Sequence, residues 1–105
     1  MSKYRTHTCG ELTKNNNGSD VTLSGWINKK RDHGNLLFID LRDNFGITQC
    51  IIDKENKFFN NLEKMQLETV IKIDGTVAER SPDTINNEIK TGEIEVKILT
   101  YEVLG

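Results

Sequence analysis

The sequence has few of the features that mark secreted, membrane-bound or metal-binding proteins. It contains only two cysteines, Cys9 and Cys50, and it has no apolar leader and no hydrophobic run long enough to cross a bilayer. These absences predict a protein of the reducing cytoplasm without a membrane partner. His7 and Cys9 have the chemistry of metal ligands, but no second ligand pair follows at the spacing of a zinc site. We therefore expect no bound metal.

The sequence also lacks an excess of positive charge. Its 14 Lys and Arg residues are outnumbered by 16 Asp and Glu residues, which gives a net charge of −2 at pH 7 and a pI near 5.7. A general polyanion binder is normally broadly basic. Any nucleic-acid site in this chain must therefore be a local patch.

A catalytic arrangement is missing as well. Asp40, Asp43 and Asp53 are scattered over a turn and two predicted strands, and no nucleophile lies near them in the pattern. We expect no catalytic residue in this chain.

The chain does contain enough apolar residues for one folded domain spanning residues 1–105. Of its 105 residues, 35% are hydrophobic and 29% are charged, which is typical of a globular protein. Five segments alternate apolar and polar residues and are predicted to be strands: 21–30, 36–42, 47–53, 70–77 and 92–100. Residues 56–66 have the apolar spacing of a short amphipathic helix. This order matches an all-β fold with one short helix, the five-stranded Greek-key barrel called the OB-fold.

The connecting segments give more local predictions. Residues 1–14 are expected to form a short strand or helix that covers one end of the domain. Gly25, in the middle of the first strand, predicts a bend or bulge. Gly46 ends a hairpin turn over residues 43–46, at a position open to positive φ. Residues 80–91 are expected to form a long loop.

Cations and one aromatic stand out on the first two predicted strands. Lys29, Lys30 and Arg31 follow one another where the first strand ends, and they are either a solvated strand end or phosphate and base contacts. Three phosphate contacts to a single strand would give a log–log salt slope of only about −2, enough to position a nucleic acid but not to hold it. Phe38 faces outward among polar neighbours. It is either covered by a loop or offers a base a stacking platform worth roughly 1–3 kcal/mol.

Four further polar residues are candidate contacts. Gln49 on the third strand is either an ordinary polar residue or reads a base edge through two hydrogen bonds. Glu95 on the last strand would repel phosphate, so its functional interpretation is as an acceptor for base N–H groups, against the alternative of a solvated face. His33 is an ordinary turn residue in the simpler interpretation. Arg80 lies in the loop of residues 80–91, and no spacing argument places it.

Three classes of function fit this pattern. The first is an RNA-binding module that reads unstacked bases. The second is a protein-interaction domain that uses the exposed strand face of the barrel for docking. The third is a sequence-neutral binder of single-stranded nucleic acid, which would be expected to have more aromatics and more positive charge.

The segments THTCGEL (6–12), VTLSGWINKKRDHGNLLFIDLRDNFGITQ (21–49) and TGEIEV (91–96) resemble a known family. They are similar to the N-terminal anticodon-binding domain of bacterial-type aspartyl-tRNA synthetases, and the resemblance spans nearly the whole chain. It implies that tRNA(Asp), and not DNA, is the partner. Phe38 would then stack on the central anticodon uracil, Gln49 would read base edges, Arg31 would contact the RNA and Glu95 would recognise the first anticodon base.

The resemblance also implies a longer parent enzyme, a class II synthetase that uses ATP and Mg²⁺ to attach aspartate to tRNA and is usually a homodimer. No segment of this chain resembles the class II catalytic motifs. We therefore expect an excised anticodon-binding domain, with no activity and no cofactor of its own. His33 lies where the family approaches the third anticodon base, and a histidine there resembles enzymes that accept both tRNA(Asp) and tRNA(Asn).

Overall fold

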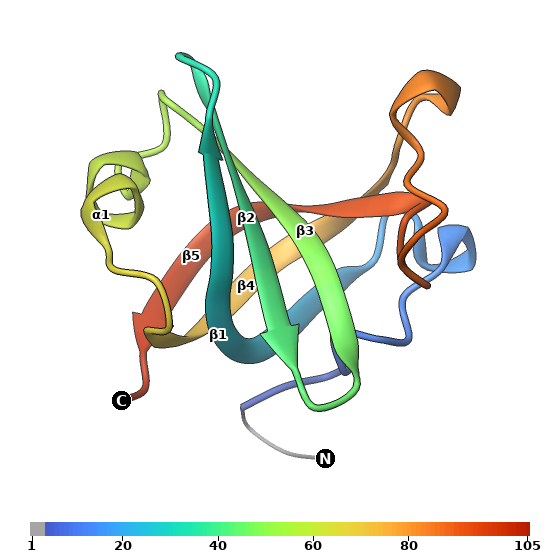
Figure 1. Ribbon diagram of the computed structural model, residues 1–105, viewed down its shortest axis with the longest axis horizontal. Coiled ribbons are helices and arrows are strands. Elements are labelled where there is room, and N and C mark those ends of the chain that lie inside the picture. Colours follow the sequence, from blue (N-terminus) through green and yellow to red (C-terminus); the bar gives the residue numbers. More distant parts are fainter. Residues whose placement is uncertain (1–3) are drawn as a thin grey trace.

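Five strands close into a barrel in the order β1-β2-β3-β5-β4 in the computed structural model, which describes residues 4–105 (Figure 1). The strands are β1 (Asp20–Asp32), β2 (Leu36–Asp43), β3 (Gly46–Asp53), β4 (Val70–Glu79) and β5 (Ile94–Val103). The helix α1 (Phe59–Lys64) lies between β3 and β4. Neighbouring strands are antiparallel except β3 and β5, which are parallel. All five predicted strands are present, and the predicted OB-fold is confirmed.

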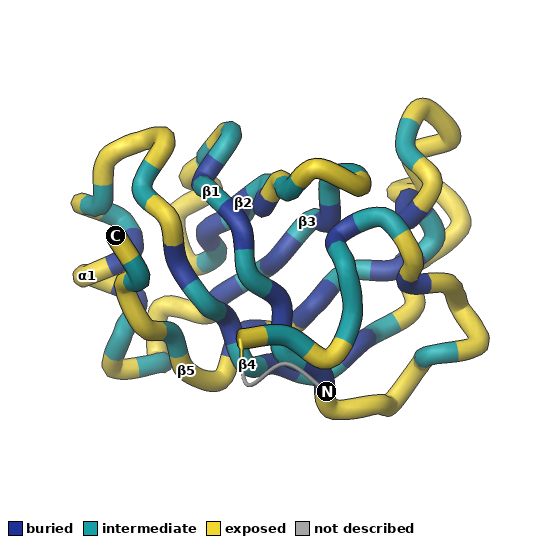
Figure 2. The backbone as a smooth tube through the Cα atoms, turned by 90° about the horizontal axis from the view of Figure 1, so that it is seen from below, coloured by how far each residue is buried: buried dark blue, intermediate teal, exposed yellow. Residues whose placement is uncertain are grey.

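The apolar residues that alternate with polar ones in the sequence are the buried residues of the strands. On β2, Leu37, Ile39 and Leu41 are at most 1% exposed, whereas Phe38 and Asp40 are half-buried on the outer face. Figure 2 shows the same change between buried and more exposed residues along the barrel strands. Full burial of each Leu or Ile contributes about 1.5–3 kcal/mol. A slip of one residue would turn these side chains to the solvent, so burial fixes which residues face outward.

The N-terminal segment covers one end of the barrel, but it was wrongly predicted as a strand or helix. Residues 4–13 have no regular secondary structure, and a single 3-10 turn (Lys14–Asn16) follows. Cys9 and Leu12 are fully buried. The Cys9 N–H donates to Asp43 Oδ2 at 2.8 Å, and the Cys9 carbonyl accepts from Thr48 Oγ1 at 2.7 Å. The Thr6 N–H also donates to the Thr22 carbonyl of β1 at 2.8 Å, so the segment is held by one strand backbone and by side chains without forming a strand of its own. Residues 1–3 of the prediction lie outside the described residues.

The cysteines carry no disulfide and both lie in the core. Cys9 and Cys50 are free and fully buried. Burial raises the pKa of both thiols well above the ordinary value. Both side chains therefore act as small apolar groups in the barrel interior.

One glycine prediction needs correction and another is confirmed. Positive φ occurs at Gly18 and Gly34 but not at Gly46, where a Cβ atom would lie only 2.8 Å from the Cα of Gly10. Gly46 is therefore required for close packing against the N-terminal segment. Gly25 precedes Trp26, where the pairing of β1 passes from β4 to β2, so the predicted bend is confirmed, and the register irregularity follows between Ile27 and Lys29. Gly25 itself lies against the carbonyl of Arg42, where a side chain would clash.

The helix is shorter than the sequence predicted. It covers Phe59–Lys64, whereas residues 56–66 have the helical spacing. The Asn56 side chain accepts from the Phe58 N–H at 2.9 Å and holds a turn before the helix. Met65 is already extended. Phe59 and Leu62 are the buried helix residues, so one short turn is enough to cover this side of the barrel. Neither this helix nor any other within residues 4–105 is long and apolar enough to span a membrane.

Candidate nucleic-acid interface

Four polar side chains from four strands form a continuous hydrogen-bonded chain on the outer face of the barrel. Arg31 of β1 donates to both carboxylate oxygens of Asp40 on β2, at 3.1 and 3.2 Å. It also donates from Nη2 to Gln49 Oε1 on β3, at 2.9 Å. Gln49 Nε2 in turn donates to Glu95 Oε1 on β5, at 3.0 Å. We call these four residues the polar network.

Strand register explains why these residues meet. Asp40 and Gln49 are paired across β2 and β3. The pairing of Cys50 with Val96 places the preceding residues of the parallel strands β3 and β5, Gln49 and Glu95, side by side. Asp40, Gln49 and Glu95 face away from the core, since buried residues alternate with them. Arg31 reaches the same face through its hydrogen bonds to Asp40 and Gln49.

Phe38 lies next to the polar network. It pairs with Arg31 in the strand register, and the Arg31 guanidinium carbon is 5.9 Å from the centre of the Phe38 ring. The His33 ring meets Phe38 edge-on, with centroids 5.1 Å apart and planes at 76°. Phe38 is only half-buried. The structure therefore brings His33, Arg31 and an accessible aromatic ring together, as a stacking platform requires.

Arg80 lies beside the polar network, but its donors are used by the backbone. It is 9% exposed, with Nε donating to the Ile94 carbonyl at 2.9 Å and Nη1 to the Thr84 carbonyl at 3.0 Å. Burial lowers its pKa, and the nearby carboxylates of Glu95 and Asp40 oppose that shift. Arg80 thus joins the 3-10 turn Pro82–Thr84 to the start of β5. The segment predicted as a long loop is anchored at this point.

The two lysines before Arg31 are placed differently. Lys30 turns to α1, where its ammonium group donates to the carbonyls of Leu62 (3.3 Å), Glu63 (2.7 Å) and Met65. It therefore closes the C-terminal end of the helix, and its three donors are occupied. Lys29 is exposed, and its ammonium group makes no hydrogen bond or ion pair within residues 4–105.

Asp40 is the member of this site that the sequence did not single out. In the sequence it is one of three scattered carboxylates without a catalytic partner. In the structure its carboxylate holds the Arg31 guanidinium through two parallel bonds, a geometry that fixes the orientation of the fork. The signal in the sequence was its outward position on the same strand as Phe38, two residues away.

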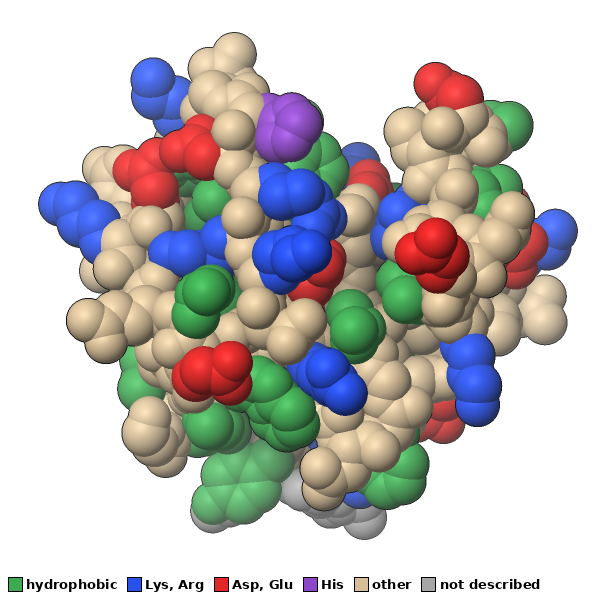
Figure 3. Space-filling model, viewed as in Figure 1, with side chains coloured by type: hydrophobic (Ala, Val, Ile, Leu, Met, Phe, Trp, Pro, Cys, Tyr) green, Lys and Arg blue, Asp and Glu red, His purple; other side chains and the backbone are tan. Residues whose placement is uncertain are grey.

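The charges of this face are locally balanced. Arg31 and Arg80 are matched by Asp40 and Glu95. Figure 3 shows Lys and Arg side chains gathered next to a histidine on this side of the molecule. Within the described residues no group of three or more His, Cys, Asp or Glu side chains could hold a metal ion. The groups available are an aromatic face, fixed donors and fixed acceptors. Their chemistry is that of hydrogen-bonded recognition.

An accessible aromatic beside a polar network on the face of an OB barrel defines a nucleic-acid-binding OB-fold domain. Comparison with known families gives the more specific assignment. The chain belongs to the tRNA anticodon family of OB-fold nucleic acid binding domains, which matches residues 21–104.

Individual relatives agree with this assignment. The aspartate–tRNA(Asp/Asn) ligase of Pelagibacter ubique is 71% identical over 105 residues, which are all of this chain and 18% of that protein. The enzyme of the same name from Paracoccus denitrificans is 56% identical over the same shares of the two chains. Asparaginyl-tRNA synthetase from Pyrococcus horikoshii, solved with asparaginyl-adenylate, superimposes with a TM-score of 0.78 at 25% identity, over 93% of this chain and 22% of that one. The chain therefore spans about a fifth of the length of these relatives.

Proposed function

We propose that this chain is the anticodon-binding domain of an aspartate–tRNA ligase and that it reads the GUC anticodon of tRNA(Asp). The observation that carries the proposal is the contact between Phe38 and a hydrogen-bonded network spanning four strands. The platform and the network supply stacking and base-edge hydrogen bonds on one surface, which recognition of unpaired RNA bases requires.

Each residue of the site has a distinct role in this proposal. Phe38 stacks on the central uracil of the anticodon. Gln49 reads base edges, since its amide offers both an acceptor and donors. Glu95 accepts from the N–H groups of the first base, and Arg31 positions the RNA while holding the Gln49 amide in orientation. Lys29 adds a mobile positive charge beside them.

The proposed parent is a longer protein that contains the chemistry this chain lacks. It would be a cytoplasmic class II ligase that binds ATP and Mg²⁺, attaches aspartate to the 3′ end of its tRNA and works as a homodimer. This chain would be one domain of it, responsible for anticodon reading alone. The support is the 71% identity to an enzyme of that name.

The second tRNA is a finer part of the proposal. His33, at the tip of the β1–β2 turn, makes a T-shaped contact with the Phe38 ring, so it borders the space next to the proposed stacked base. The relatives from Pelagibacter ubique and Paracoccus denitrificans are both named for tRNA(Asp) and tRNA(Asn). We propose that a GUU anticodon is accepted as well as GUC, because the histidine tolerates either third base.

A titration with three anticodon stem-loops tests anticodon reading at one fixed, moderate salt concentration. The stem-loops carry GUC, GUU, and GUC with its central uracil replaced. We expect similar affinities for the first two and weaker binding of the third. Equal binding of all three would contradict sequence reading and favour a charged patch. A strong preference for GUC over GUU would contradict only the role proposed for His33.

A further inference from the structure

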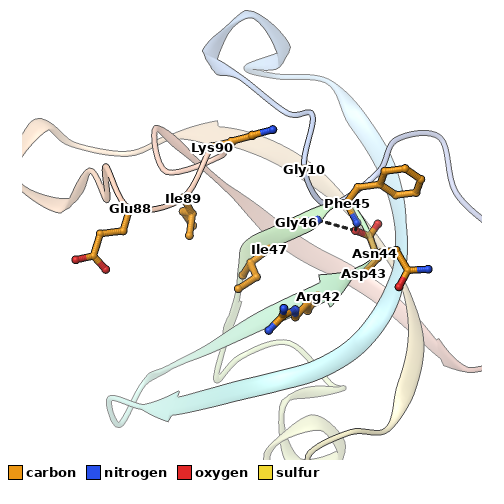
Figure 4. Close-up of a pocket in the computed structure, with 10 residues that line it drawn as sticks. All are labelled: Gly10, Arg42, Asp43, Asn44, Phe45, Gly46, Ile47, Glu88, Ile89 and Lys90. Carbon is orange, nitrogen blue, oxygen red and sulfur yellow. Dashed lines mark hydrogen bonds between the residues drawn. The ribbon is translucent and has the colours of Figure 1, made fainter.

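We call the surface formed by Phe38 and the polar network the base-reading face. A second surface of the domain lies in line with it. It is a pocket of about 380 Å³ between the β2–β3 turn and residues 88–90 of the β4–β5 connection (Figure 4). Arg42 lies on one side of it and Lys90 on the other, with Ile47 between them. The polar network and Phe38 do not take part in this pocket.

The pocket continues the face of β2 on which the bases are proposed to lie. Phe38, Asp40 and Arg42 alternate with the buried residues of β2 and share its outer face. Arg42 pairs with Ile47 on β3, just as Asp40 pairs with Gln49. From Phe38 to Arg42 the strand rises roughly 13 Å. An RNA strand that leaves the stacked base along β2 would therefore arrive at this pocket.

The far wall of the pocket is fixed to the barrel. The Thr91 hydroxyl donates to the Ile47 carbonyl at 2.5 Å, and the Asn86 N–H donates to the Gly92 carbonyl at 3.0 Å. Gly92 lies so close to the carbonyl of Asn86 that no side chain would fit there. Residues 88–90 are thus held opposite β2 by the packing of the segment that carries them.

The cationic side chains of this pocket are free to bind an anion, whereas its carboxylates are partly neutralised or turned away. Arg42 and Lys90 are exposed, and neither the guanidinium of the first nor the ammonium of the second makes a hydrogen bond or ion pair within residues 4–105. Asp43 accepts from the N–H groups of Cys9, Phe45 and Gly46, which offset its charge. Glu88 is the remaining acidic group, and Figure 4 shows its side chain and that of Lys90 pointing away from one another.

We infer that this pocket holds the sugar–phosphate backbone of nucleotides next to the recognised triplet. Arg42 supplies a fixed fork of donors and Lys90 a mobile charge to the phosphates, while Ile47 and Ile89 contact the sugars. The inference rests on the proposed function, because it takes the direction of the RNA from the base-reading face. A backbone site fits better than a base site, since the aromatic lining residue, Phe45, turns its ring outward to Arg5, 5.3 Å away.

The double variant Arg42→Gln/Lys90→Gln of the 105-residue chain tests the inference. The probes are the GUC stem-loop and the stem-loop with the central uracil replaced, titrated over a range of salt. We expect the log–log salt slope to become shallower by about 1.4, the value for two single-strand phosphate contacts. The affinity ratio between the two stem-loops should stay as in the unmodified chain, because backbone contacts carry no base information.

The matched control is Lys57→Gln/Lys64→Gln. It removes the same charge next to α1, which lies at the other end of the long axis from residues 80–91 (Figure 1). An unchanged slope in the first variant, or an equal change in the control, would overturn the inference and leave the proposed function standing if the two stem-loops are still discriminated. A shallower slope without discrimination in any protein would support the backbone site and overturn base reading. Absence of RNA binding by the unmodified chain would overturn both.

Discussion

Lys30 and Arg31 are neighbours in the chain and are both cations with satisfied donors, yet they serve two different regions. Lys30 lies on the α1 side of β1, where its acceptors are backbone carbonyls at the end of a helix. Arg31 lies on the outer face, where its acceptors are the side chains of Asp40 and Gln49. Of the helix carbonyls, that of Leu62 also accepts from the Met65 N–H at 3.2 Å, whereas those of Glu63 and Met65 depend on Lys30. The side-chain hydrogen bonds of Arg31, in contrast, can be exchanged for bonds to a ligand.

Under the proposed function, this difference separates a region that stabilises the fold from the region proposed to bind RNA. Removing a donor from a helix terminus leaves acceptors unsatisfied in the folded state. Removing one from the polar network changes the groups that are offered to an RNA base. Mutations in the two regions should therefore change different quantities. Those near Lys30 should change the free energy of unfolding, and those in the polar network should change RNA binding.

The largest effect is expected at Phe38. Phe38→Ala should weaken binding of the GUC stem-loop by about 1–3 kcal/mol, at least roughly fivefold, because the base loses its stacking partner. The half-buried ring contributes less to the core, so the midpoint of urea unfolding should change little. Phe38→Tyr keeps a ring of the same shape and should retain binding. RNA affinity within twofold of the unmodified chain in the alanine variant would show that no base stacks there.

Lys30→Met should have the next largest effect, on stability. It leaves the carbonyls of Glu63 and Met65 at the end of α1 without their donor, which should cost about 1–2 kcal/mol of unfolding free energy. RNA affinity under native conditions should be unchanged. Lys29→Met is the matched control, because Lys29 is exposed and its ammonium group makes no hydrogen bond or ion pair within residues 4–105. Urea unfolding measures the first variant against the second, and equal stability of the two would remove the distinction between the regions.

Arg31→Lys should change RNA discrimination more than stability. The charge is kept, but the fork that holds Asp40 and Gln49 together is lost. We expect discrimination against the replaced central base to fall about tenfold, the size of one hydrogen bond to a charged group, with a stability change of at most about 1 kcal/mol. The affinity ratio of the two stem-loops measures this effect. A large loss of stability with an unchanged affinity ratio of the two stem-loops would show that Arg31, like Lys30, stabilises the fold and does not read bases.

The smallest effect is expected for Glu95→Gln. The amide keeps the size of the side chain and an acceptor for Gln49, but it loses the charge that favours base N–H groups. Preference at the first anticodon base should change by less than about tenfold and overall affinity by less than that. Stem-loops that differ only at the first base report on it. A uniform loss across all of them would argue against a role in specificity.

The sequence predicted the strands and the outward position of Phe38 because both depend on alternation within a segment. It did not predict the irregular N-terminal segment, since the bonds that hold Cys9 come from the side chains of Asp43 and Thr48, more than 30 residues away. It assigned Gly46 to a turn conformation, whereas the packing of Gly10 against it is the actual constraint. Asp40 was overlooked for a similar reason, because its partner Arg31 is on another strand.

The sequence by itself determined which side chains face away from the core, because burial of alternating apolar residues leaves only one stable assignment of faces. It also determined the family, because residues 21–104 match the family pattern. Only the tertiary structure decided what each outward side chain meets. Gln49 and Glu95 are 46 residues apart and become partners through the parallel pairing of β3 and β5. Likewise, the position of α1 gives Lys30 a different set of partners from its neighbour Arg31. Contacts between distant segments depend on strand register and helix placement, which the sequence does not show.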